Sequence, residues 1–469
     1  RQAGIAAGDR VLLRIGNTID FPVCFLALAA LDAVGMPCSV ALTDREVMEL
    51  LRKTHPKAMI CDPKLGLEEF DGQTLQTQQV QAFQTLPPAR PILGDPNRPG
   101  YIIFTSGTSG QPRAVLHAHR AVWARRMMWE GWYQLTSQDV MMHAGALNWT
   151  YTLGTGLMDP WAIGASAVIP NTQEPAKLWQ IMQAEKANIF AAAPGIYRRL
   201  LQQPLPCPSS LRHGLSAGDI LPQALRGSWR DHTQTPICEA FGMTECSTFL
   251  SATPSAPDHL AVQPGRKIAI FDGDDLVPCG QVGTIAVDSQ DPGLMLGYIE
   301  DAALTLPVKN GWYHTADQGQ IFADGRIEFA GRSGDILNAG GYRVAPRELE
   351  QILEACPGVQ EVGVTEVEVR RDVSVIAAFV VAEEQFDVAQ LDALAAADAA
   401  HAVRALRIVS EGEVLAEREH GARARALRHV HACRVHLVEE GEAALLGQVA
   451  PAIRVEFRWN YGGVRVQFG

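Results

Sequence analysis

Short apolar runs typical of β-strands alternate along this chain with segments of helical periodicity. Strands joined through helices pair in parallel, so this alternation predicts an α/β fold. It continues to about residue 331, which predicts one large α/β region. The expected elements in that region are strands 11–15, 38–41, 58–61, 139–144, 165–169 and 189–193 and helices 21–34, 44–52, 119–132, 149–163, 179–187 and 195–203.

Length and charge narrow the class of partner. The chain has 469 residues, a hydrophobic content of 47% and a formal net charge of −12. These values predict at least two domains and small-molecule partners, with no nucleic acid and no membrane surface as ligand. Nine cysteines without metal-ligand spacing indicate reduced thiols and a cytoplasmic location. The apolar run 21–34 is too short to span a bilayer. Because Arg1 stands almost at the first strand, we expect a preceding N-terminal segment.

A loop rich in glycine and hydroxyl residues follows the apolar segment 101–104. It contains Thr105, Ser106, Gly107, Thr108, Ser109 and Gly110, with Arg113 beyond a proline. Backbone N–H groups, hydroxyls and a guanidinium together suit a phosphate group. The spacing is not that of a Walker loop, which requires a lysine-hydroxyl pair opening a helix. The other interpretation is an ordinary glycine-serine turn.

A second group of polar residues follows the strand-like segment 237–240. Phe241 can stack on a purine, Gly242 permits close approach, Thr244 can bind a phosphate oxygen, and the Glu245 carboxylate suits Mg²⁺. Alone, a pentapeptide of this kind would more often be a strand-to-loop turn. Cys246 is expected to be a packing residue.

Two further segments have side chains suited to a nucleoside. Gly218 and Asp219 belong to a ledge of small residues that could cover an adenine face. Asp317, expected in a polar turn, could bind two ribose hydroxyls, and Arg332 follows a predicted hairpin at 324–328. Asp317 could equally be a turn residue, and Arg332 a structural ion-pair partner.

In their order and spacing, these motifs resemble those of the AMP-forming acyl-CoA synthetases of the adenylate-forming superfamily. The resemblance covers residues 1 to about 385 and includes the segment 340–350. It implies an α/β fold in two parts. A large multi-layer N-terminal domain would span residues 1–331, and the first part of a small α+β C-terminal lid would span residues 332–385. Residues 386–469 form a divergent tail for which no fold is predicted.

The resemblance also implies the reaction and its participants. A small carboxylic acid attacks ATP to give acyl-AMP and pyrophosphate, and the thiol of coenzyme A then displaces AMP, with Mg²⁺ as cofactor. Thr105, Thr244, Glu245 and Arg113 would act in catalysis. Ser106, Gly107, Thr108, Ser109, Gly110, Gly218, Asp219, Phe241, Gly242, Asp317, Arg332, Gly341 and Arg343 would bind the nucleotide or coenzyme A. Glu245 would hold the metal and Gly334 would be the hinge of the lid. A homodimer is compatible with this resemblance.

The segment 143–154 corresponds to the carboxylate pocket of such enzymes. Trp149 and Tyr151 would either shape that pocket or pack in the core, and as pocket residues they would favour a short-chain or aromatic acid. His143 is expected to be a polar wall of the pocket. A carboxylate that is already ionised at neutral pH needs no general base.

The tail departs from the family pattern, in which a distal lysine binds the attacking carboxylate and the α-phosphate. All seven lysines of this sequence lie at or before Lys309. We therefore expect slow adenylation, with the thiolation face from Gly334 to Arg343 retained. Two other functions fit the sequence: a nucleotide- or acyl-adenylate-binding protein without turnover, and an adenylation domain that loads a carrier protein.

Overall fold

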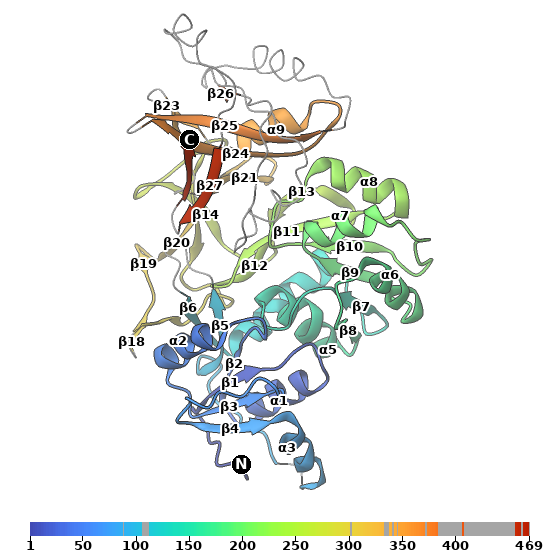
Figure 1. Cartoon of the computed structure of the whole chain (residues 1–469), viewed down its shortest axis with the longest axis vertical. Helices are drawn as coiled ribbons and strands as arrows, with labels where there is room; N and C mark the ends of the chain where they lie inside the picture. Colours follow the sequence, from blue (N-terminus) through green and yellow to red (C-terminus); the bar gives the residue numbers. More distant parts are fainter. Residues whose placement is uncertain are drawn as a thin grey trace, which may run out of the picture.

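The structure is a computed structural model of the chain, shown in Figure 1. It describes residues 1–87, 89–105, 112–300, 303–332, 337–339, 342–344, 346–370, 373–382, 406–407, 455–460 and 463–468. None of the helices in these ranges combines the length and the apolar character needed to cross a bilayer.

The first sheet has eight strands in the order β18-β17-β6-β5-β2-β1-β3-β4. Strands β1 to β4 pair in parallel with their neighbours in this order, whereas β5 and β6 form an antiparallel hairpin. Their bounds are β1 Arg10–Arg14, β2 Val34–Pro37, β3 Ala58–Cys61, β4 Gln73–Gln76, β5 Pro99–Thr105, β6 Arg113–Ala118, β17 Gly297–Glu300 and β18 Ala303–Thr305.

Two helices join the first three strands, α1 Asp20–Ala30 and α2 Asp44–Thr54. A capping box begins α2, because the Thr43 hydroxyl accepts the N–H of Glu46 while the Glu46 carboxylate accepts the N–H of Thr43. His55, in the left-handed conformation, ends this helix. Helix α3 Thr77–Gln81 and the 3₁₀ turn η1 Ala82–Thr85 follow β4.

The second sheet has seven strands in the order β13-β12-β11-β10-β9-β7-β8. It is parallel from β8 to β11 and antiparallel from β11 to β13. The strands are β7 Val140–His143, β8 Ser166–Val168, β9 Ile189–Ala192, β10 His213–Ser216, β11 Ile237–Met243, β12 Ser247–Thr253 and β13 Ala256–Val262, with helices α6 Pro175–Ala184, α7 Pro194–Gln202 and α8 Gln223–Thr233.

A helical layer contributes to the cores of both sheets. Leu153 and Leu157 belong to the apolar core of the first sheet, and Met128 and Trp132 belong to that of the second. The molecule is therefore layered, as the sequence predicted. The segments of this layer are α4 Arg120–Ala124, the 3₁₀ turn η2 Arg125–Met128, the π-helices η3 Trp129–Tyr133 and η4 Thr152–Met158, and α5 Asp159–Ile163.

A third, antiparallel sheet packs beside these layers, with strand order β15-β14-β16-β20-β19 and β21 paired to β20. Glycine, aspartate and proline turns between apolar segments at 265–285 predict short strands in this part of the sequence. The strands are β14 Ile268–Asp272, β15 Asp275–Leu276, β16 Gly283–Asp288, β19 Val308–Lys309, β20 Trp312–Ile321 and β21 Ile327–Arg332.

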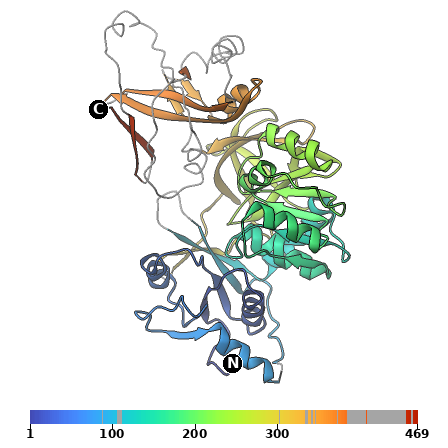
Figure 2. The same ribbon diagram turned by 45° about the vertical axis from the view of Figure 1, so that its right-hand side comes forward.

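The smaller C-terminal elements lie at the opposite end of the molecule from the N-terminus (Figures 1 and 2). The sequence predicts a helix at 346–355 and strands at 362–368 and 373–381, and helix α9 with the long hairpin of β24 and β25 confirms them. The domain boundaries at 331 and 385 stay predictions. The elements are β22 Leu337–Ala339, β23 Tyr342–Val344, α9 Pro346–Glu354, β24 Val359–Arg370, β25 Val373–Ala382, β26 Leu406–Arg407, β27 Val455–Asn460 and β28 Gly463–Phe468.

Three local predictions are wrong. The strand expected at 38–41 is β2, at Val34–Pro37, because α1 already ends at Ala30. The segment 72–98, which its polar and proline-rich sequence predicts to be a surface connection, includes the edge strand β4 and helix α3. Asp317 lies inside β20 rather than in a turn, because both β16 and β21 pair with that strand.

Candidate active site

The predicted phosphate loop joins the two strands of the β5–β6 hairpin. Thr105 at the end of β5 pairs with Arg113 at the start of β6. The loop residues Ser106, Gly107, Thr108, Ser109 and Gly110 lie outside the described residues. The ammonium group of Lys53 in α2 donates a hydrogen bond to the carbonyl of Pro112. Lys53 therefore places a positive charge at the base of the loop. The position of Lys53 in an amphipathic helix did not predict this contact.

Arg113 lies on an aromatic ring. Its guanidinium carbon is 3.4 Å from the centroid of the Tyr298 ring, and its Nη2 is 3.6 Å from Oε1 of Glu300. The Arg113 and Glu300 side chains are 38% and 51% exposed, so water screens this ion pair. The ring contact is the more directional of the two.

Glu245 lies in the tight turn between β11 and β12. Its Oε1 accepts a hydrogen bond of 2.7 Å from the Tyr298 hydroxyl, and its carbonyl accepts one of 2.7 Å from the N–H of Met295. The Tyr298 hydroxyl is also 2.9 Å from that of Tyr313. Glu245 and Arg113, predicted from motifs far apart in the sequence, thus contact the same tyrosine.

The same turn is anchored on its inner side. Ser247, with φ of 59°, accepts a hydrogen bond from the buried guanidinium of Arg125. Cys246 is fully buried beside the ion pair of Arg266 and Asp291. Burial raises the pKa of the Cys246 thiol, so Cys246 is a packing residue, as predicted.

Phe241 and Gly242 lie within β11, which extends three residues further than the segment predicted as a strand. The Phe241 ring contacts those of Phe249 and Phe329, with centroids 5.5 and 5.1 Å away. A side chain at position 242 would collide with the Ser247 carbonyl of β12. Gly242 therefore permits close approach of β12, a structural reason for glycine that is independent of any nucleotide.

Gly218 and Asp219 lie in the exposed loop after β10, near the carboxyl ends of parallel strands. Gly218 has φ of +91°, and a side chain there would meet open space. The backbone conformation, rather than crowding, therefore favours glycine at this position. The Asp219 carboxylate accepts the N–H of Ile220.

The two predicted ribose ligands form an ion pair. Asp317 in β20 and Arg332 in β21 are paired residues of neighbouring strands, with Nε of Arg332 3.2 Å from Oδ1 of Asp317. Asp317 is 4% exposed, whereas the Arg332 side chain is 55% exposed. Both alternatives for Arg332, structural ion-pair partner and ribose ligand, therefore involve its ion pair with Asp317.

His143 is buried at the end of β7. Its Nδ1 accepts the N–H of Gly145 at 3.0 Å, and its Nε2 has no hydrogen-bond partner among the described residues. Burial, assisted by the charge of Arg125, lowers the pKa of His143 to about 3. The neutral ring therefore carries its proton on Nε2 and is a donor. The role of His143 as a polar wall of the pocket stays a prediction.

The two aromatic pocket candidates differ in environment. The Tyr151 ring contacts that of His143 edge to face at 4.4 Å, and its hydroxyl donates to the Leu215 carbonyl. Trp149 is 50% exposed. Tyr151 is thus packed in the core of the second sheet, whereas Trp149 is open to a ligand or to solvent.

The predicted lid contacts are only partly described. Gly334 and Gly341 lie outside the described residues. Arg343 lies in β23, opposite Asn338 of β22. Their roles as hinge, tunnel border and phosphate-facing residue stay predictions.

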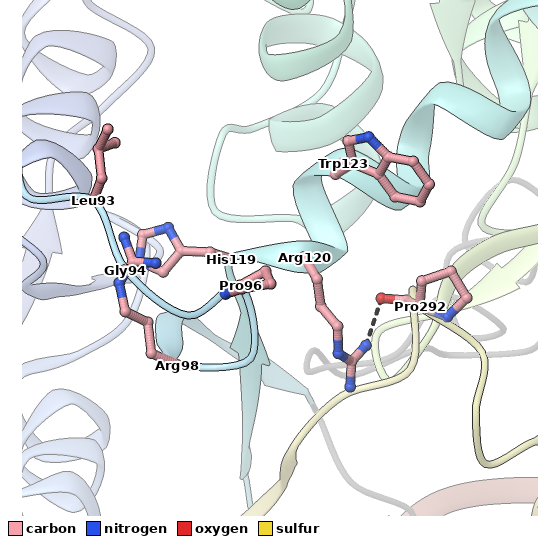
Figure 3. A pocket seen from close by; sticks show the side chains of 8 residues that line it. All are labelled: Leu93, Gly94, Pro96, Arg98, His119, Arg120, Trp123 and Pro292. Carbon is pink, nitrogen blue, oxygen red and sulfur yellow. Dashed lines mark hydrogen bonds between the residues drawn. The ribbon is translucent and has the colours of Figure 1, made fainter.

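A surface hollow of about 500 Å³ lies at the other end of the β5–β6 hairpin from the phosphate loop (Figure 3). Arg98, His119, Arg120 and Trp123 line it, and Arg120 donates a hydrogen bond to the carbonyl of Pro292. Among the residues predicted for the nucleotide, none of those that the structure describes lines this hollow.

The side chains of the proposed site that could bind a metal suit one that binds together with the phosphates of its substrate. No group of three His, Cys, Asp or Glu side chains with metal-binding geometry occurs in the described part of the chain. Mg²⁺ commonly binds through one or two carboxylates together with substrate phosphates. A single carboxylate at Glu245, near Arg113, fits that mode.

The sequence comparisons identify the family. The model of the family described as AMP-binding enzyme matches residues 1–299. A 3-hydroxybenzoate–CoA/4-hydroxybenzoate–CoA ligase of Thauera aromatica is 25% identical over 414 residues, covering 82% of this chain and 79% of that protein. The mitochondrial acyl-coenzyme A synthetase ACSM3 of Homo sapiens is 29% identical, covering 76% of this chain and 66% of its own length.

Among solved structures, ATP-bound MatB from Rhodopseudomonas palustris superimposes with a TM-score of 0.76 at 24% identity, covering 86% of this chain and 84% of that one. This similarity shows a shared fold and confirms the predicted α/β class. The family match covers well over half of the 469 residues. The chain is therefore a member of the AMP-binding enzyme family.

Proposed function

We propose that this protein activates a small carboxylic acid with ATP to form an acyl-adenylate and then transfers the acyl group to coenzyme A. The observation that supports this most directly is the convergence of Glu245 and Arg113 on Tyr298 at the base of the phosphate loop. A carboxylate suited to a metal and a cation suited to phosphate thus lie together, in a chain of the AMP-binding enzyme family.

In the first step, a carboxylate oxygen of the acid attacks the α-phosphorus and the bond to the β-phosphate breaks, releasing pyrophosphate. Thr105, Arg113 and the loop residues Ser106 to Gly110 bind the β- and γ-phosphates, and Thr244 binds the α-phosphate. Glu245 would hold Mg²⁺, which would supply positive charge to the phosphate oxygens. Lys53 supports the loop through its bond to Pro112.

The nucleoside is held by the remaining predicted ligands. Phe241 stacks on adenine beside the ledge of Gly218 and Asp219, and Asp317 accepts hydrogen bonds from the ribose hydroxyls, with Arg332 alongside. In the second step the sulfur of coenzyme A attacks the acyl carbon, and the bond to AMP breaks. Rotation of the lid about Gly334 brings Gly341 and Arg343 into the site for this second step.

We propose a short-chain or aromatic acid, and two observations favour an aromatic one. In the segment of the predicted pocket, the aromatic side chain of Trp149 is half-exposed. In addition, one of the relatives is a ligase of hydroxybenzoates. A cytoplasmic location and a homodimer belong to the same proposal.

The test is a panel of carboxylic acids in which AMP and pyrophosphate are followed with and without coenzyme A. We expect pyrophosphate to depend on the acid and AMP release to be accelerated by the thiol. Because the sequence contains no lysine after Lys309, adenylation is expected to be the slower step. ATP binding without acyl-adenylate for any acid would support a binding protein. Acyl transfer to a holo carrier protein but not to coenzyme A would support a carrier-loading domain.

A further inference from the structure

Tyr298 makes two different contacts with the proposed site. It lies in β17, is 2% exposed, and pairs with Val115 of β6. Its hydroxyl donates to Oε1 of Glu245 at 2.7 Å, while its ring face lies 3.4 Å from the guanidinium carbon of Arg113. One rigid side chain thus joins the expected metal ligand to the expected phosphate ligand.

The direction of the hydrogen bonds follows from the chemistry of the three groups. Both phenols keep their protons at neutral pH, because a tyrosine hydroxyl ordinarily ionises only at about pH 10. A carboxylate can only accept, so Tyr298 donates its single proton to Glu245. Its oxygen then accepts the proton of Tyr313, 2.9 Å away.

This chain of donors restricts the Glu245 carboxylate. A hydrogen bond to an ionised acceptor is shorter and stronger than one between neutral groups. The bond uses Oε1 and fixes the plane of the carboxylate relative to β17. The same strand holds Arg113 through the ring of Tyr298, so the two charged groups keep one fixed separation.

We propose that Tyr298 is a positioning residue that couples the Glu245 carboxylate to the Arg113 guanidinium, so that the metal and the triphosphate are bound at a fixed separation from each other. This inference rests on the proposed function. It assigns the two contacts separable effects, because the hydroxyl acts on metal binding and the ring acts on phosphate binding.

Two substitutions separate these effects. Tyr298→Phe keeps the ring beneath Arg113 and removes the donor to Glu245. Tyr298→Leu removes both. Tyr313→Phe removes the donor to Tyr298 but leaves both contacts of Tyr298 in place. Tyr197→Phe is the matched control, since its buried hydroxyl bonds only to the carbonyls of Phe190 and Leu215 in the described structure, away from the site.

The experiment is calorimetric titration of the intact protein with ATP at a series of Mg²⁺ concentrations, with thermal unfolding as a check on folding. For Tyr298→Phe we expect the Mg²⁺ concentration for half-maximal ATP affinity to rise about 10-fold, with little change in affinity at saturating Mg²⁺. For Tyr298→Leu we expect affinity at saturating Mg²⁺ to fall as well, by about 2- to 30-fold. Tyr313→Phe should give a smaller shift in Mg²⁺ dependence than Tyr298→Phe.

The outcomes distinguish this inference from the function on which it rests. An unchanged Mg²⁺ dependence in Tyr298→Phe, with Mg·ATP bound by the wild type, would overturn the inference alone. Equal shifts in Tyr298→Phe and Tyr197→Phe would also overturn it, because they would reflect general destabilisation. Failure of the wild type to bind Mg·ATP would overturn the proposed function and the inference with it.

Discussion

Arg125 and Asp159 form an ion pair in the helical layer, with Nη2 of the arginine 2.7 Å from Oδ2 of the aspartate and both side chains 2% exposed. The Tyr133 hydroxyl donates to the same oxygen at 2.8 Å, and the arginine also donates to Ser247 beside the Glu245 turn. The pair therefore connects the helical layer to the proposed site.

Removing one charge of this pair should be strongly destabilising. Asp159→Asn leaves the guanidinium buried without its counter-charge, and we expect the free energy of unfolding to fall by about 3–5 kcal/mol. Chemical denaturation measures this change. The control is Glu174→Gln, which breaks the exposed pair with Lys177 and should cost less than about 1 kcal/mol. Equal losses in the two variants would contradict the prediction.

Gly154 should be intolerant of a side chain for a related reason. A Cβ at this position would overlap the guanidinium of Arg125, which Asp159 holds in place. We expect Gly154→Ala to lower the free energy of unfolding by about 1–3 kcal/mol. Gly227 in α8 is the matched control, because a Cβ there meets no atom within 4 Å. Gly227→Ala should stabilise the protein by roughly 0.5–1 kcal/mol, and a stable Gly154→Ala would show that Arg125 can move.

The sequence predicted those elements whose ends carry local signals. Strand β3 was predicted at its observed bounds, since an apolar run lies between the left-handed His55 and Asp62. The start of β2 was misplaced because the run 21–34 is apolar except for Asp32, and periodicity does not mark the end of α1 at Ala30.

The sequence indicates candidate motif residues but not the side chains that contact them. Tyr298 follows a glycine in a short apolar strand and looks like any core residue. Its contact with Glu245 spans 53 residues and exists only after β17 pairs with β6. Asp317 was assigned to a turn because the pairing of β20 on both sides depends equally on distant segments.

Asp317 should determine preference for ribose over deoxyribose. If its carboxylate accepts the ribose hydroxyls, wild-type protein should bind ATP more tightly than 2′-deoxy-ATP by about 10-fold or more. Asp317→Asn should reduce that ratio severalfold, as measured by competition binding. Asp324→Asn is the control, because Asp324 lies in the exposed turn after β20 and bonds the N–H of Arg326. A ratio unchanged by Asp317→Asn would leave Asp317 as the structural partner of Arg332.

Stability should fall as the pH drops below about 6.5, because three histidines are buried without charge. Burial lowers the pKa of His117 and of His213 to about 4, and that of His143 to about 3. Below pH 6.5 the unfolded chain binds protons that the folded protein excludes, so acid favours unfolding down to about pH 4. Each histidine should contribute about 1.4 kcal/mol per pH unit well inside this interval. His213→Gln removes one of the three without altering a predicted site residue. Denaturant unfolding between pH 7.5 and 5 should therefore show a shallower pH dependence for this variant, with about one proton fewer taken up on unfolding, and identical slopes would mean that His213 is protonated in the folded state.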